Sequence, residues 1–238
     1  MPLGPTPQHL GDIWVESTDS LWVVGDYGTI RRWDGTRWVE HASGTLAQLF
    51  AIAGTGPSDI WAGGEAGTLL HYDGQRWQAV NSGTTMTIRD LWATSSDHVI
   101  GVAGDFKDGS ILYNATVLRW DGVSWNTEQI PNVATLVGVW GTAANDVWAV
   151  GHGTIVHWNG SAWTPFQIPA IGTPVVWGVW GRNEHDVWAV GEGGLIVHWD
   201  GSAWTKQRSP GAAILRQIVG TSDGIWVVGD GAILRHDP

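Results

Sequence analysis

Residues 186–204, DVWAVGEGGLIVHWDGSAW, are the clearest copy of a unit that recurs along the chain. Related copies occupy residues 20–38 (SLWVVGDYGTIRRWDGTRW), 59–77 (DIWAGGEAGTLLHYDGQRW) and 146–163 (DVWAVGHGTIVHWNGSAW). One large apolar residue marks each copy: Trp22, Trp61, Ile100, Trp148, Trp188 and Trp226. Their successive spacings are 39, 39, 48, 40 and 38 residues, so the sequence contains six repeats and the third is enlarged. A period near 40 residues is typical of repeat architectures.

Each repeat has the composition of short β-strands. Runs rich in Val, Ile and Trp alternate with turn residues, and Asp-Gly or Asn-Gly lies between the last two runs in five repeats. Four short antiparallel strands in each of six repeats predict an all-β, six-bladed β-propeller. We expect a single domain, 1–238, with blades at about 10–45, 46–84, 85–133, 134–173, 174–212 and 213–238 plus 1–9.

The two ends of the sequence suggest how the ring closes. The sixth repeat ends in GAILRHDP, without the Asp-Gly hairpin and the fourth strand. Residues 1–9 precede the first blade, and their prolines suit an edge strand. We therefore expect the N-terminal segment to complete the last blade.

Composition excludes several classes of function. The formal net charge of -11 disfavours nucleic acid as a partner, because the phosphate backbone is also negative. The sequence has no cysteine, no apolar run of membrane-spanning length and no secretory signal in its first residues, so its localisation stays open. No metal-binding or nucleotide-binding motif occurs, and we expect neither a cofactor, a metal site nor a catalytic constellation.

The motifs DVWAVGxGG and HWDGSAW resemble tryptophan-rich bacterial propeller repeats of the kind common in myxobacterial proteins. They are also distantly similar to Asp-box (BNR-type) repeats, although the full Asp-box spacing is not kept. The WDGxxW phrase resembles one found in fucose-binding propeller lectins, but the Arg and Glu of their preceding strand are not reproduced. The resemblance covers nearly the whole chain and implies a propeller, a fold that carries many unrelated functions.

Most of the 19 tryptophans recur at equivalent positions of the repeat, which indicates packing between blades. Trp177 is an exception, because its position is not regularly aromatic and its counterparts are Gly11, Phe50, Arg89, Val137 and Arg216. Tyr27 is an additional aromatic residue in the turn between the second and third strands. Both are candidate ligand-binding residues, and both are equally compatible with an ordinary surface role.

Two rings of polar residues recur once per blade. The first lies in the turn after the second strand and consists of Asp26, Glu65, Asp105, His152, Glu192 and Asp230. Its carboxylates suit either solvated turns or acceptors for sugar hydroxyls. The second consists of Arg32, His71, Arg119, His157, His198 and Arg235. These side chains are interpreted as hydrogen-bonded structural groups, with ligand binding by His157 and His198 as the alternative.

Aromatic residues beside carboxylates favour a carbohydrate-binding, lectin-like propeller with repeated weak sites. The alternatives are a protein–protein interaction scaffold and an enzyme with its site on the axial face. The expected partners are glycans or a protein, and the oligomeric state is left open.

Overall fold

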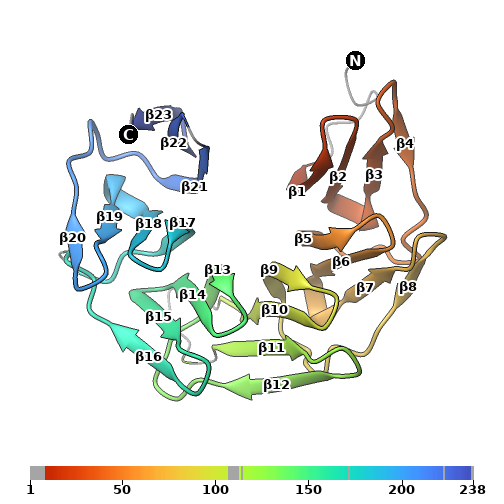
Figure 1. Cartoon of the computed structure of the whole chain (residues 1–238), viewed down its shortest axis with the longest axis horizontal. Coiled ribbons are helices and arrows are strands. Elements are labelled where there is room, and N and C mark those ends of the chain that lie inside the picture. The colour runs from red at the N-terminus through yellow and green to blue at the C-terminus, as the bar shows by residue number, and fades with distance from the viewer. Residues whose placement is uncertain (1–8, 107–112, 114, 171, 222, 237–238) are drawn as a thin grey trace. The chain divides into compact units, whose positions relative to one another are not determined.

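The computed structural model describes residues 9–106, 113, 115–170, 172–221 and 223–236 (Figure 1). The chain forms two compact units, which are described separately. One comprises residues 1–104 and 116–128, and the other comprises residues 105–115 and 129–238.

The first unit contains three antiparallel sheets of four strands, each ordered as in the sequence. The first blade is β1 (Leu10–Ser17), β2 (Ser20–Gly25), β3 (Ile30–Trp33) and β4 (Trp38–Glu40). The second blade is β5 (Leu49–Gly56), β6 (Asp59–Gly64), β7 (Leu69–Tyr72) and β8 (Trp77–Ala79). The third blade is β9 (Ile88–Ser95), β10 (His98–Ala103), β11 (Thr116–Trp120) and β12 (Trp125–Gln129).

The second unit repeats the same plan. The fourth blade is β13 (Leu136–Ala143), β14 (Asp146–Gly151), β15 (Thr154–Trp158) and β16 (Trp163–Phe166). The fifth blade is β17 (Val176–Asn183), β18 (Asp186–Gly191), β19 (Ile196–Trp199) and β20 (Trp204–Lys206). The sixth sheet contains β21 (Leu215–Thr221), β22 (Gly224–Gly229) and β23 (Ala232–His236).

This topology confirms the prediction of six sequential antiparallel blades, and the described residues contain no α-helix. Residues 1–8 of the proposed closing segment, 1–9, and residues 107–112 of the third-repeat insertion lie outside the described residues. The assignment of 1–238 to a single domain stays a prediction.

The Asp-Gly and Asn-Gly turns fold as the sequence predicts. In the first blade the Asp34 carboxylate accepts the backbone N–H groups of Thr36 and Arg37, both at 2.9 Å. Gly35 has φ of 89°, in the left-handed region that glycine adopts without steric cost. The turns at Asp73, Asp121, Asn159 and Asp200 use the same pair of hydrogen bonds.

Most second-strand tryptophans form the core between neighbouring blades, whereas Trp226 is 40% exposed. Trp22, Trp61 and Trp148 are only 1–2% exposed. Each meets a fourth-strand tryptophan of the following blade edge to face, in the pairs Trp22–Trp77, Trp61–Trp125 and Trp148–Trp204 at 5.7, 5.1 and 5.3 Å between ring centroids. This geometry supports the structural interpretation of the repeated tryptophans.

First-strand tryptophans pack in a second way, against glycine. The rings of Trp140 and Trp180 lie over Gly181 and Gly220, each in the first strand of the next blade. A Cβ atom built on Gly181 would come within 2.7 Å of the Trp140 ring, and one on Gly220 within 2.0 Å of the Trp180 ring. Glycine is therefore required where the indole crosses the adjoining strand.

Replacing Trp148 by alanine is expected to lower the free energy of unfolding by about 3–5 kcal/mol, because a fully buried ring leaves a cavity between two blades. Trp148→Phe should cost less, and Val123→Ala, at an 86% exposed hairpin tip, should have almost no effect. Chemical denaturation of the three variants measures the difference. Equal stability of Trp148→Ala and the wild type would contradict the packing role.

Candidate functional site

Three of the acidic turn residues hold the chain where it enters their own blade. Glu192 accepts the backbone N–H of Val175 at 3.0 Å through Oε2, while its own N–H donates to the Val175 carbonyl at 3.0 Å. Asp26 pairs in the same way with His9, and Glu65 with Gln48. One oxygen of each carboxylate is therefore used within the fold, which sequence reasoning missed because the partner lies 17 residues away.

The residue after each of these carboxylates adopts a left-handed backbone conformation. Tyr27 has φ of 56°, and Ala66 and Gly193 occupy the same position with φ of 52° and 64°. Tyr27 is also 73% exposed, so its ring projects from the turn beside Asp26. A non-glycine residue in this region is uncommon and marks Tyr27 as a presented side chain.

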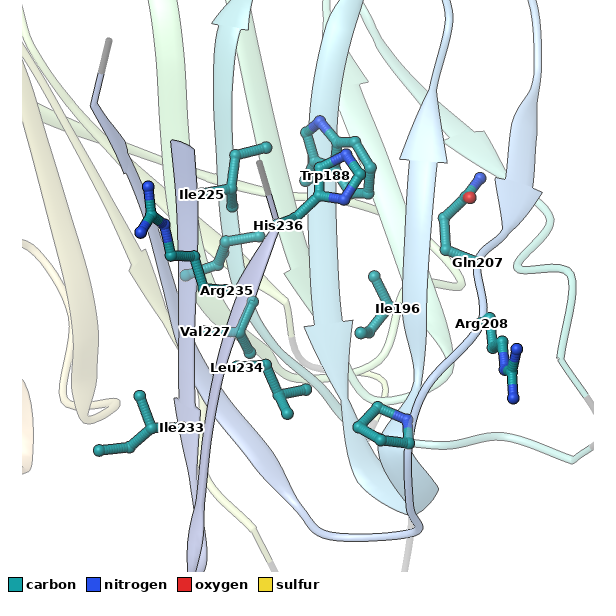
Figure 2. Close-up of a pocket in the computed structure, with 12 residues that line it drawn as sticks. Trp188, Ile196, Gln207, Arg208, Ile225, Val227, Ile233, Leu234, Arg235 and His236 are labelled. Carbon is teal, nitrogen blue, oxygen red and sulfur yellow. The ribbon is translucent and has the colours of Figure 1, made fainter. Parts of the chain in front are cut away.

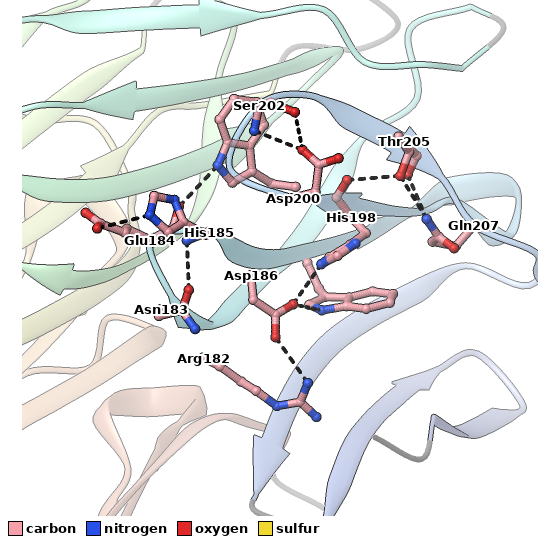
Figure 3. A network of polar contacts seen from close by, with 12 residues as sticks. Arg182, Asn183, Glu184, His185, Asp186, His198, Asp200, Ser202, Thr205 and Gln207 are labelled. Atoms are coloured by element: carbon pink, nitrogen blue, oxygen red, sulfur yellow. Dashed lines mark hydrogen bonds and ion pairs between the residues drawn. The ribbon is translucent and has the colours of Figure 1, made fainter.

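The candidate histidines are tied into a network within their own blades. In the fifth blade, the Asp186 carboxylate is 2.7 Å from His198 Nε2 and accepts the Trp188 indole N–H at 2.7 Å (Figure 3). The His198 ring stacks on Trp188 with ring centroids 4.2 Å apart. His71 repeats this arrangement with Asp59 and Trp61. His157 pairs with Asp146 and stacks on Trp148, but the Trp148 indole N–H has no partner among the described residues. The imidazoles therefore hold the second and third strands together.

Hydrogen bonding also controls the charge of Asp186. Burial alone would raise the pKa of this carboxyl, but hydrogen bonds from Trp188, His198 and Arg182 outweigh it and hold the pKa below its usual value. The Arg182 guanidinium contributes at 3.1 Å. The carboxylate is thus stabilised in its ionised form in the folded protein.

Trp177 lies in an aromatic and charged cluster, called the Trp177 cluster below. The Arg216 guanidinium carbon is 5.4 Å from the centroid of the Trp177 ring, and the Phe106 ring is 6.2 Å from it. Arg216 also forms a bidentate ion pair with Asp230, at 2.6 and 2.8 Å. The Trp177 Nε1 atom is buried and has no hydrogen-bond partner among the described residues.

Interactions within the Trp177 cluster stabilise the charged forms of both Arg216 and Asp230. The pKa of Arg216 is raised, first by its hydrogen bonds to Asp230 and also by the field of Glu192. The pKa of Asp230 is lowered by the same hydrogen bonds. The structure therefore places Glu192 and Asp230 around Arg216, which contacts Trp177.

The Arg216–Trp177 contact has a counterpart in the first unit. The Arg89 guanidinium lies over the Phe50 ring, 5.2 Å from its centroid. Phe50 in β5 corresponds to Trp177 in β17, and Arg89 in β9 corresponds to Arg216 in β21. Both arginines occupy this position of the repeat, but nothing within one repeat marks them as site residues. A search for complementary pairs one repeat apart would have found them.

The remaining acidic candidate, Asp105, follows β10. Its carbonyl oxygen accepts the Thr135 hydroxyl at 3.0 Å. Within the described part of the chain, no cluster of three or more metal-ligating side chains occurs, and no helix is long and apolar enough to span a membrane.

Comparisons place this architecture among known folds. No family model matches the sequence, and no curated protein matches it. The chain is similar to the solved structure of YCF48 bound to D1 peptide, with 17% identity and a TM-score of 0.74 over 98% of this chain and 79% of that one. The chain folds as a six-bladed β-propeller.

WD40 propellers are similar as well. The RRP9 WD40 repeats align with a TM-score of 0.76 at 12% identity, covering 95% of this chain and 75% of that one. The WD40 propeller domain of Doa1 aligns with a TM-score of 0.60 at 15% identity, over 98% and 93% of the two chains. At these identities the likeness concerns the fold alone. Membership of the bacterial tryptophan-rich or lectin-type groups stays a prediction.

Neutralising Asp186 should destabilise the propeller in a pH-dependent way. Since the folded-state pKa is depressed, the ionised carboxylate stabilises the fold above the unfolded-state value of about 4, and this contribution is lost as the pH falls through the folded-state pKa. Asp186→Asn is expected to cost about 1–3 kcal/mol at pH 7, and the deficit should shrink below about pH 4.

Urea unfolding of the wild type and Asp186→Asn between pH 7 and pH 3 measures this deficit. Glu128→Gln, at an exposed position in β12, is the control. A deficit that stays constant across this range would contradict the role assigned to the charge.

Proposed function

We propose that this propeller is a protein-interaction module that binds a basic, extended segment of a partner at the Trp177 cluster. The observation that carries the proposal is the cluster itself, in which aromatic rings lie beside an Arg–Asp ion pair. Among the similar propellers, YCF48 was solved with a peptide bound, which supports a peptide as the class of ligand.

The chemistry of the Trp177 cluster favours a cationic residue. Phe106 is 42% exposed. The carboxylates of Asp230 and Glu192 both raise the pKa of Arg216 and so favour a positive charge at this place. An incoming lysine or arginine gains a ring face and a carboxylate acceptor at the same place. The net charge of -11 adds a long-range attraction for a basic partner.

Carbohydrate binding is the second candidate, and Tyr27 is the observation that favours it. Its ring is exposed beside Asp26, which provides an apolar platform next to a hydroxyl acceptor. At Trp177, by contrast, Arg216 covers one ring face, and the neighbouring carboxylates favour a cationic residue over a neutral sugar. We therefore propose Tyr27 as the candidate site for a glycan and the Trp177 cluster as the candidate site for a peptide.

A random peptide-display library and a glycan array, both probed with the wild-type protein, separate the two candidates. The display should enrich peptides containing lysine or arginine. If the display enriches no peptide and the protein binds a glycan that Tyr27→Ala no longer binds, the protein-interaction hypothesis is wrong and the lectin hypothesis is supported.

Trp177→Val is expected to weaken binding of a selected basic peptide by about 1–3 kcal/mol, because the aromatic anchor is lost. Stability should change little, since Val137 occupies the same position in the fourth blade. Phe50→Val, at the equivalent position of the first unit, is the matched control and should leave affinity unchanged. Calorimetry of both variants measures the effect, and an unaltered affinity for Trp177→Val would place the site elsewhere.

A further inference from the structure

The sixth blade borders a pocket beside Trp188. The pocket has a volume of about 440 Å³ and lies between the fifth and sixth blades, both in the second unit. Trp188, Ile196, Val227, Leu234 and His236 are among its lining residues (Figure 2). Its wall is therefore mainly apolar, and a tryptophan ring from the repeat forms part of it.

Other blades show which group occupies this place. The second-strand tryptophan normally contacts two aromatic residues of the following blade, one from the third strand and one from the fourth. For Trp148 these are Trp199, at 5.3 Å, and Trp204, also at 5.3 Å. Trp22 has the corresponding contacts with Tyr72, at 4.9 Å, and Trp77, at 5.7 Å.

Within the described residues, Trp188 has the contact with the third strand of the following blade and lacks the contact with a fourth strand. His236, at the end of β23, lies 5.2 Å from the Trp188 ring and takes the third-strand position. The sixth sheet contributes no fourth strand to the described structure, so the place of a fourth-strand aromatic ring is the pocket.

Strand register specifies how a fourth strand would pair. His236 is opposite Ile225, just as Trp199 is opposite Val187 in the fifth blade. Trp199 is paired in turn with the fourth-strand Trp204. An antiparallel strand added to β23 would therefore place its aromatic residue opposite His236, with the ring directed toward Trp188.

The segment expected to complete this blade, residues 1–9, contains no Phe, Trp or Tyr that could fill the pocket. We therefore propose instead that β23 is a docking edge for an extended partner segment that carries an aromatic anchor. The segment adds as a fourth antiparallel strand, and its aromatic side chain fills the pocket beside Trp188. Main-chain hydrogen bonds supply affinity and the pocket supplies selectivity. This edge is separate from the Trp177 cluster, where Trp177 and Arg216 belong to the first strands β17 and β21.

The chain itself provides a probe. A fluorescein-labelled peptide copies residues 201–208, GSAWTKQR, the fourth strand of the fifth blade, with Lys206→Gln and Arg208→Gln so that it offers no basic residue to the Trp177 cluster. Fluorescence anisotropy with the full chain should show saturable binding. The same peptide with alanine in place of its tryptophan should bind at least tenfold more weakly, and bound probe should slow hydrogen exchange at residues 232–236.

Two protein variants locate the binding edge. Leu234→Lys alters a pocket-lining residue and should weaken probe binding at least tenfold. Val219→Lys alters a residue of β21 that is 52% exposed and does not line the pocket, and it tests whether added charge alone matters. It should reduce affinity less than threefold. Thermal melts confirm that both variants fold.

Two results would overturn the proposal. One is an affinity that does not depend on the tryptophan of the probe or on Leu234. The other is binding that appears only after residues 1–8 are deleted, because the edge would then be filled by the chain itself. Loss of the Trp177 site would leave probe binding unchanged, so this test and that of the proposed function fail independently.

Discussion

The flat indole ring between adjacent sheets is the constraint on which the fold depends. Blades diverge from one another, so the space between them needs a large rigid side chain at one side and a flat surface at the other. Trp148 meets this need through edge-to-face contact with Trp204, and Trp180 meets it by crossing Gly220. The abundance of both tryptophan and glycine thus has one cause, which is the fit of one repeat against the next.

Each buried indole carries an N–H donor that needs an acceptor, and the repeat provides one for only some of these tryptophans. Trp61 and Trp188 donate their N–H groups to Asp59 and Asp186, at 3.1 and 2.7 Å. The equivalent indole nitrogen of Trp148 has no such partner in the described structure. A buried donor without an acceptor costs free energy, so the core is held by ring packing, and the aspartates add orientation.

Much of the architecture was predictable from the sequence because each repeat carries its own local signals. Asp-Gly turns and runs rich in Val, Ile and Trp predicted the strands, and the recurrence of tryptophan predicted the packing between blades. The candidate site was less predictable, since its contacts join residues far apart in the sequence. Arg216 reaches Trp177 from the next blade, and Glu192 pairs with the backbone of Val175, 17 residues before it, so neither role has a short-range signal.

The turn after the second strand separates backbone geometry from side-chain identity. Tyr27, Ala66 and Gly193 share a left-handed conformation although their side chains differ completely. The following glycine and the preceding carboxylate fix that geometry, and the middle side chain is left to vary. Such a position can evolve quickly or be randomised in a library, one residue per turn, while the scaffold keeps its shape.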